Sequence, residues 1–113
     1  MADFEQARQE ALQFRDERDW LQFHNPKDLA ISINLEASEL LELFQWSAAD
    51  CEVSKKRMEM LEELADIMIY CIHLADRLGV DVPEIIEAKI MKNARKYPVE
   101  LSRGNSEKRT LAE

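Results

Sequence analysis

Apolar residues recur at three- and four-residue spacing over most of the chain, which is the pattern of amphipathic helices. The pattern predicts four helices, over about residues 3–19, 26–48, 55–78 and 82–97. Asn25 before Pro26 is a start signal for the second helix, and Gly79 is a stop signal for the third. Pro98 ends the fourth, because the residue before a proline is disfavoured in helical backbone.

Composition also favours helices. The 113 residues include only two Gly and three Pro, which leaves little material for tight turns between strands. A chain of this length holds one hydrophobic core. We therefore predict an all-α fold, a four-helix bundle forming one domain over residues 1–98. The polar, aperiodic residues 99–113 are expected to form a mobile tail.

The second and third predicted helices are too apolar for surface helices of a monomer. Ile31 and Leu35 lie away from the main apolar stripe of the second helix and still require burial. Apolar residues cover about half of the circumference of the third helix. One chain of this size can hardly cover both surfaces, so we expect a homo-oligomer, at least a dimer.

Two glutamates of the second helix stand at positions where carboxylates are costly. On a helical wheel, Glu36 falls inside the apolar stripe that Leu29, Leu40 and Phe44 help to form. Glu39, one short turn further, lies among apolar neighbours. Such positions are unfavourable for ionised groups unless a positive charge lies close by.

The third helix carries a matching set of polar residues. Glu63, Asp66 and Tyr70 share one helical face, because their spacing is i, i+3 and i+7. Packing this face against Glu36 and Glu39 would bring four carboxylates together. Oxygen ligands on a rigid frame suit Mg²⁺ or Mn²⁺, so the two pairs predict a metal site. Either pair alone would be typical of a solvated acidic surface.

Charge and motifs exclude several other functions. The net charge of −8 argues against binding to nucleic acid or to an anionic membrane. Cys51 and Cys71 are far apart, as in a reduced cytoplasmic protein, and no apolar segment is long enough to span a bilayer. A di-iron bundle would require Glu three residues before a histidine, and neither His24 nor His73 has one. We expect a cytoplasmic protein.

Several other side chains allow two interpretations. Trp20, Trp46 and Tyr70 could stack on a flat ligand or belong to the core. Further residues share a face of the fourth helix, where they could bind phosphate or lie in solvent: Lys89, Asn93 and Lys96, with Lys92 and Arg95 close by. His73 is predicted to be solvated on the polar flank of its helix, and the role of Glu42 stays open.

Taken in order, these motifs resemble the MazG-like all-α nucleoside triphosphate pyrophosphohydrolases, most closely the dCTP pyrophosphatase branch. The similarity extends from about Phe14 to Pro98. Its motifs are Glu-Arg-Asp-Trp20-x-x-Phe-His24, Leu-Glu36-x-x-Glu39-Leu-x-Glu-Leu-Phe-Gln-Trp46, Glu62-Glu63-Leu-x-Asp66-x-x-Ile-Tyr70 and Lys89-x-x-x-Asn93-x-Arg-x-Tyr97-Pro98. Many members of the family begin the second motif with Glu-Glu, whereas this chain has Leu35, as in the dCTP-type branch.

The resemblance implies a function for each motif. Four residues would bind Mg²⁺, with Mn²⁺ as an alternative: Glu36, Glu39, Glu63 and Asp66. Seven would bind substrate: Trp20, His24 and Trp46 around the base, and Tyr70, Lys89, Asn93 and Lys96 at the sugar and phosphates. Glu39 is the candidate catalytic residue that orients or deprotonates the attacking water.

The implied reaction is hydrolysis of dCTP or a modified dCTP at the α–β bond, giving a monophosphate and pyrophosphate, for nucleotide-pool sanitation. The family's branch forms tetramers as dimers of dimers. Three alternatives remain. One is a related hydrolase that prefers dUTP or a broad range of non-canonical nucleotides. Another is a phosphoribosyl-ATP pyrophosphatase of the same fold, which the Trp20 and Trp46 pair disfavours. The last is a catalytically silent helical assembly module.

Overall fold

The computed structural model describes residues 2–110, which contain helices and no strand. The helices are α1 (Phe4–Glu17), α2 (Pro26–Glu42), α3 (Arg57–Leu78), α4 (Val82–Lys96) and the one-turn α5 (Val99–Ser102), with short 3₁₀ turns at Leu21–Phe23 and Ser54–Lys56. The predicted all-α class is confirmed. The chain divides into two compact units, Met1–Gly79 and Val80–Glu113. The domain boundary at residue 98, the four-helix bundle and the oligomer stay predictions.

Local capping explains where three of the helices begin and where α3 ends. The side chains of Asp3, Asn25 and Asp81 each accept a hydrogen bond from a backbone N–H in the first turn of α1, α2 and α4, respectively. Pro26 follows Asn25 at the start of α2, as the sequence predicted. Gly79 ends α3 in the left-handed conformation, with φ of 67°.

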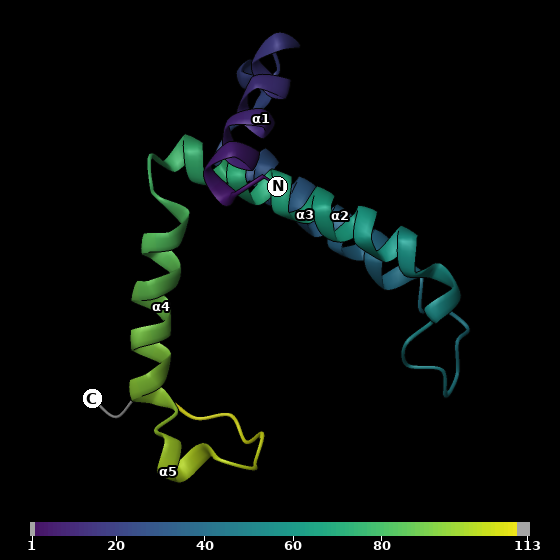
Figure 1. The fold of residues 1–113 in the computed structure, drawn as a ribbon, viewed down its shortest axis with the longest axis vertical. Helices are drawn as coiled ribbons and strands as arrows, with labels where there is room; N and C mark the ends of the chain where they lie inside the picture. Colours follow the sequence, from purple (N-terminus) through teal and green to yellow (C-terminus); the bar gives the residue numbers. More distant parts are fainter. Residues whose placement is uncertain (1, 111–113) are drawn as a thin grey trace. The chain divides into compact units, whose positions relative to one another are not determined.

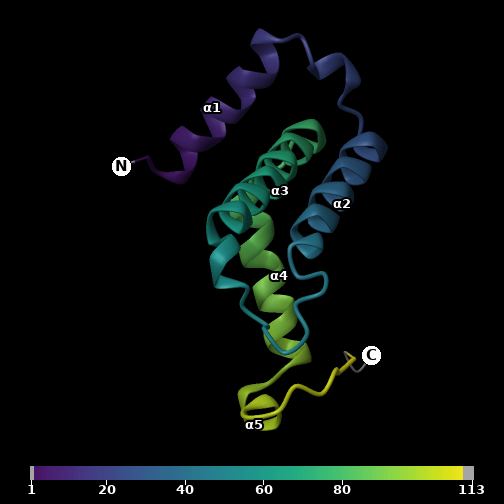
Figure 2. The same ribbon diagram turned by 90° about the vertical axis from the view of Figure 1, so that its right-hand side faces the viewer.

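The first unit is organised around α2 and α3, which lie side by side as a helical hairpin closed by residues 43–56 (Figures 1 and 2). Helix α1 packs on α3. Leu29 of α2 and Ile72 of α3 are buried in the core. Within the described residues, no helix is both long and apolar enough to cross a lipid bilayer. The cytoplasmic location stays a prediction.

The end of α2 differs from the prediction. The helix was expected to reach Trp46 or Ala48 but stops at Glu42, after which backbone bonds join residues three apart, such as Phe44 N–H to the Leu41 carbonyl. Trp46 and Ala48 then adopt positive φ, at 66° and 50°, which is incompatible with a right-handed helix. The apolar periodicity continues through this turn, so it predicted a longer helix than the structure contains.

Large apolar side chains remain exposed on the helical hairpin of the first unit. They are Ile31, Leu35 and Leu41 on α2 and Met58, Leu61, Leu64, Met68, Ile69 and Leu78 on α3. This agrees with the excess of apolar positions in the sequence of both helices. A single chain therefore leaves an apolar surface exposed on α2 and α3, and the prediction of an oligomer is based on that surface.

The second unit consists of α4, α5 and the residues that follow. Residues 99–102 form one helical turn where the sequence predicted an aperiodic tail, and the Leu101 N–H donates to the Pro98 carbonyl. Arg109 returns to the end of α4, where its backbone N–H donates to the Tyr97 hydroxyl and its Nε donates to the Lys96 carbonyl. These bonds give part of the tail a defined path.

Candidate active site

Three of the predicted carboxylates lie close together on α2 and α3. One oxygen from each of Glu36, Glu39 and Glu63 falls within 4.8 Å of the others. Glu36 and Glu63 are half-buried, and Glu39 is exposed. The fourth predicted ligand, Asp66, lies outside this set, but its charge raises the pKa of both Glu36 and Glu63. The i, i+3 pairs of the two helices therefore face each other as predicted.

The electrostatics of the carboxylate cluster, defined as Glu36, Glu39 and Glu63, are unfavourable in the free protein. Burial and the neighbouring carboxylate of Glu39 raise the pKa of Glu36 to about 7, with smaller effects from Asp66 and Glu63. Glu39, followed by burial, also raises the pKa of Glu63. None of the ion pairs found among the described residues involves this cluster.

The donor set fits a divalent cation. Glu36 Oε2 and Glu63 Oε2 are buried and have no hydrogen-bond partner among the described residues. Buried carboxylate oxygens without a donor are costly, and the mutual repulsion of the cluster adds to that cost. A hard cation bound by oxygen atoms would remove both penalties. The three residues, with Asp66 beside them, are therefore the candidate ligands.

A cavity of about 520 Å³ opens beside the carboxylate cluster in the first unit. Glu36 and Asp66 contribute to its wall, and the rest is mostly apolar and aromatic: Ala7, Ala11, Phe14, Trp20, Ile69 and Tyr70, with Glu10, His24 and His73. A second cavity, of about 410 Å³, shares Trp20, His24 and Tyr70 with the first. Both volumes lie within the range of small-molecule sites.

The predicted aromatic residues have different environments. Trp20 borders both cavities and meets Phe14 edge to face, with ring centroids 5.7 Å apart. Tyr70 also borders both cavities. Trp46 is 91% exposed and borders neither of them. The structure therefore groups Trp20 with Tyr70, and the base-binding role of Trp46 stays a prediction.

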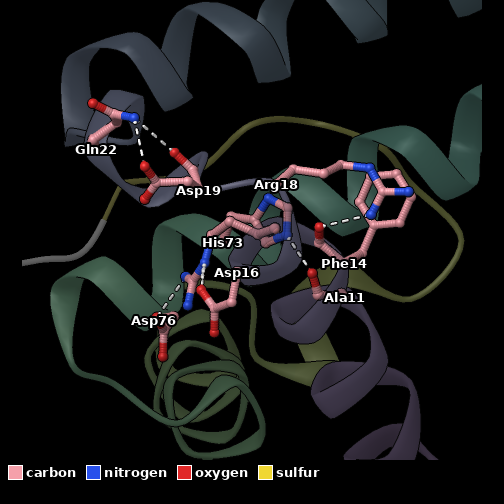
Figure 3. Close-up of polar contacts among 9 residues, drawn as sticks. Ala11, Phe14, Asp16, Arg18, Asp19, Gln22, His73 and Asp76 are labelled. Atoms are coloured by element: carbon pink, nitrogen blue, oxygen red, sulfur yellow. Dashed lines mark hydrogen bonds and ion pairs between the residues drawn. The ribbon is translucent and has the colours of Figure 1, made fainter.

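His73 corrects a prediction from the sequence. It was expected to be solvated, yet its side chain is only 3% exposed, and its Nε2 lies 2.9 Å from the Ala11 carbonyl oxygen (Figure 3). Its ring lies 4.9 Å from that of His24, between centroids. Burial lowers the pKa of both histidines, so both rings are neutral at pH 7.

Arg15 joins α1 to α3 beside this histidine. It is 4% exposed, its Nε donates to Asp16 at 2.9 Å, and its Nη1 donates to Asp76 at 2.7 Å. Sequence reasoning missed both Arg15 and His73. One signal was available for His73, which follows Asp66 and Tyr70 at helical spacing and therefore shares their face.

The remaining predicted residues belong to α4 or lie outside the cluster. Lys89, Asn93 and Lys96 are in the second unit, where Asn93 and Lys96 are half-buried and Lys89 is exposed. Their roles at the phosphates stay predictions. Glu42 is exposed and is not part of the carboxylate cluster.

Comparison with known proteins gives the family. Residues 31–110 match the model of the MazG-like family. The chain belongs to the MazG-like family. This match covers most of the chain and includes the whole carboxylate cluster. The resemblance inferred from the four motifs is therefore confirmed.

Several MazG-like relatives carry a more specific name. The chain is 43% identical over 104 residues to dCTP pyrophosphatase 1 of Mus musculus and 41% identical over 104 residues to dCTP pyrophosphatase 1 of Homo sapiens. Each alignment covers 87% of this chain and 61% of the relative, so the chain spans less than two thirds of their length.

A solved structure is also similar. The crystal structure of a pyrophosphatase from Archaeoglobus fulgidus DSM 4304 matches with a TM-score of 0.79 and 41% sequence identity, over 87% of this chain and 94% of that one. The similarity in fold thus extends over nearly the whole of that structure.

Proposed function

We propose that this protein hydrolyses a nucleoside triphosphate at the α–β bond, releasing the monophosphate and pyrophosphate, with dCTP or a modified dCTP as the preferred substrate. The observation that carries the proposal is the carboxylate cluster, with its two unpartnered buried oxygens, beside an aromatic cavity. The relatives named dCTP pyrophosphatase 1 support this substrate, and the similar pyrophosphatase structure supports the class of reaction. The biological role would be nucleotide-pool sanitation.

In this proposal Glu36, Glu39, Glu63 and Asp66 hold Mg²⁺, with Mn²⁺ as an alternative. A divalent cation bound there would supply positive charge to the triphosphate and would lower the pKa of water. Glu39 is the exposed member of the carboxylate cluster, so it is the one best able to orient or deprotonate the attacking water.

The nucleoside would occupy the cavity beside the cluster. Trp20 offers an aromatic face for the base, and His24 and Tyr70 border the same space. Trp46 would reach the base from the turn after α2. Lys89, Asn93 and Lys96 of α4 would bind the phosphates and offset the charge that develops on the leaving pyrophosphate.

We also propose that a second copy of the chain covers the exposed apolar side chains of α2 and α3, and that the assembly is a tetramer built as a dimer of dimers. Burial of a large apolar surface between copies would stabilise both helices of the hairpin. Sedimentation or light scattering gives the mass directly, and a monomer at micromolar concentration would contradict this part of the proposal.

The test is a panel of canonical and modified nucleoside triphosphates, with Mg²⁺, Mn²⁺ or a chelator, in which pyrophosphate and orthophosphate are measured separately. We expect pyrophosphate as the first product, dependence on the metal, and the highest kcat/KM with dCTP or a modified dCTP. Orthophosphate as the first product would contradict cleavage at the α–β bond. A preference for dUTP would favour a related hydrolase, and no turnover by the folded protein would favour a silent module.

A further inference from the structure

Glu10 of α1 is an acidic residue on the wall of the larger cavity, and the proposed reaction does not use it. Four α1 residues at helical spacing border this cavity, so this face of the helix is turned toward it: Ala7, Glu10, Ala11 and Phe14. Glu10 is the member of this set that carries a charge, and it is exposed. A ligand in the cavity can therefore contact its carboxylate.

Two hydrogen bonds hold the segment around Glu10 on α3. The carbonyl of Ala11, the next residue, accepts a hydrogen bond from His73 Nε2 at 2.9 Å. About one turn further, the Arg15 guanidinium donates to Asp76 at 2.7 Å. The backbone of Glu10 is consequently fixed beside the cavity, which limits the positions that its carboxylate can reach.

The carboxylate of Glu10 has only a weak partner among residues 2–110. One oxygen accepts a hydrogen bond from Gln6 Nε2 at 3.3 Å, between two exposed side chains, and this distance is long for an N–H···O bond. Glu10 belongs to none of the ion pairs found in the described part of the chain. A ligand with an N–H or O–H group can therefore bind this carboxylate without displacing a cation.

The charge of Glu10 determines which part of a nucleotide it can contact. A carboxylate accepts hydrogen bonds and repels other anions, so it disfavours the phosphates, which the proposed function places at the carboxylate cluster. Phe14 follows Glu10 by one helical turn, and its ring meets that of Trp20 edge to face, 5.7 Å between centroids. Glu10 is therefore one turn away from the aromatic pair that would bind the base.

Resting on the proposed function, we propose that Glu10 determines base specificity by accepting a hydrogen bond from the exocyclic amino group of an aminopyrimidine. In the matching oxopyrimidine an oxygen replaces this group, so two acceptors would face each other. The ring N–H beside that oxygen has a carbonyl group on each side, and it cannot approach the carboxylate without the same repulsion. The pairs dCTP and dUTP, or dCMP and dUMP, differ at this group and serve as probes.

Glu10→Gln is the informative variant, because it keeps the length of the side chain and an oxygen that can accept from Gln6. Its amide has a donor as well as an acceptor, so it can bind the oxo base as well as the amino base. Glu10→Ala removes the acceptor altogether. Glu17→Gln is the matched control, since Glu17 is an exposed residue of the same helix that borders neither cavity.

The measurements are kcat/KM for dCTP and dUTP, dissociation constants for dCMP and dUMP, and the melting temperature of each variant. We expect the preference for the amino base to fall at least about tenfold in Glu10→Gln, through a loss for dCTP and a gain for dUTP. Glu10→Ala should lose the preference mainly through weaker use of dCTP. The melting temperature should be retained, because Glu10 is exposed. Glu17→Gln should match the wild type throughout.

Several results would overturn the inference. One is an unchanged preference in Glu10→Gln, whatever the rate of hydrolysis. Another is an equal loss for dCTP and dUTP in Glu10→Ala, which would indicate contact with the sugar that both share. A wild type that releases pyrophosphate but prefers dUTP or neither base would contradict the inference and leave the proposed reaction intact. If the wild type hydrolyses no triphosphate, but Glu10→Gln loses a preference for dCMP over dUMP, the proposed function fails and the inference stands.

Discussion

The first unit contains two clusters of partly buried charge that differ in how completely they are satisfied. Arg15 is almost fully buried, and its guanidinium donates hydrogen bonds to the carboxylates of both Asp16 and Asp76. The buried positive charge is therefore compensated. Glu36 and Glu63 are less buried, yet each has an oxygen without a partner. The charges around Arg15 are therefore better compensated than those around Glu36 and Glu63, although Arg15 is more deeply buried.

This difference separates a structural role from a ligand-binding one. A paired guanidinium holds two helices together and needs nothing further. Carboxylates that repel one another persist in a folded chain when a ligand compensates for the repulsion, and perturbed pKa values are typical of such sites. Substitution of Arg15 should consequently lower stability, whereas substitutions in the carboxylate cluster should lower activity without lowering stability.

The largest expected effect is on hydrolysis. Glu63→Gln or Asp66→Asn should lower kcat/KM at least about 100-fold, because a ligand charge is lost from the proposed metal site. Pyrophosphate release measures the loss, and size-exclusion chromatography checks that the assembly is intact. Glu62→Gln is the matched control, since Glu62 is the exposed neighbour of Glu63. Full activity of Glu63→Gln would show that the ligand assignment is wrong.

The next effect is on stability. Arg15→Ala should lower the free energy of unfolding by about 2 kcal/mol, since it leaves the Asp76 carboxylate without its partner. For a chain of this size the melting temperature should fall by about 8 °C. Arg15→Met keeps much of the buried volume and should lose less. A melting temperature unchanged in Arg15→Ala would mean that the ion pairs add nothing to the packing of α1 on α3.

Removing a charge from the carboxylate cluster should instead raise the free energy of unfolding. The pKa of Glu36 is about 7 in the folded chain, against 4.5 as its ordinary value. Between these values the folded state binds more protons, so the free energy of unfolding falls as the pH rises from 4.5 to 7. Without divalent metal, Glu36→Gln should therefore be more stable than wild type at pH 8, by about 1 kcal/mol after allowance for its partial exposure.

Thermal melting in a chelator at pH 8 and at pH 4 tests this. The advantage of Glu36→Gln should disappear at the lower pH, where the wild-type carboxyl is protonated in both states. Addition of Mg²⁺ should raise the melting temperature of the wild type more than that of the variant. A variant less stable than wild type at pH 8 would indicate that Glu36 is already compensated in the free protein.

The smallest effect concerns the two histidines. Their pKa values are lowered from 6.5 in the folded chain, chiefly by burial, so the stability they contribute is complete above pH 6.5 and is lost as the pH falls below it. Glu36 and Glu63, whose pKa values are raised, contribute the opposite slope, so the Glu36→Gln background is used to remove the contribution of Glu36. Urea unfolding of this variant should show a free energy of unfolding that declines between pH 7 and pH 5.5. A double variant that also carries His73→Gln should decline less.

The sequence was informative wherever a short motif determines a local structure. Asn25-Pro26 and Gly79 predicted a helix start and a helix end, because capping depends on neighbouring residues alone. The two carboxylate pairs were predicted to face each other, because i, i+3 spacing fixes the side of a helix on which a residue lies.

The sequence was misleading where a partner lies far along the chain. His73 and Arg15 form hydrogen bonds with groups 62 and 61 residues away, the Ala11 carbonyl and the Asp76 carboxylate. A backbone carbonyl leaves no mark on a sequence, so polarity alone suggested that His73 was solvated. The end of α2 was missed because apolar spacing does not report the change to left-handed backbone at Trp46.

The bond between His73 and residue 11 also has a consequence for engineering. Its acceptor is the backbone oxygen, so every residue type at position 11 can supply it. Ala11 also borders the larger cavity. Replacing Ala11 by Ser or Val should therefore narrow the cavity without releasing the imidazole, so the space open to a ligand can be adjusted without breaking the bond that joins α1 to α3.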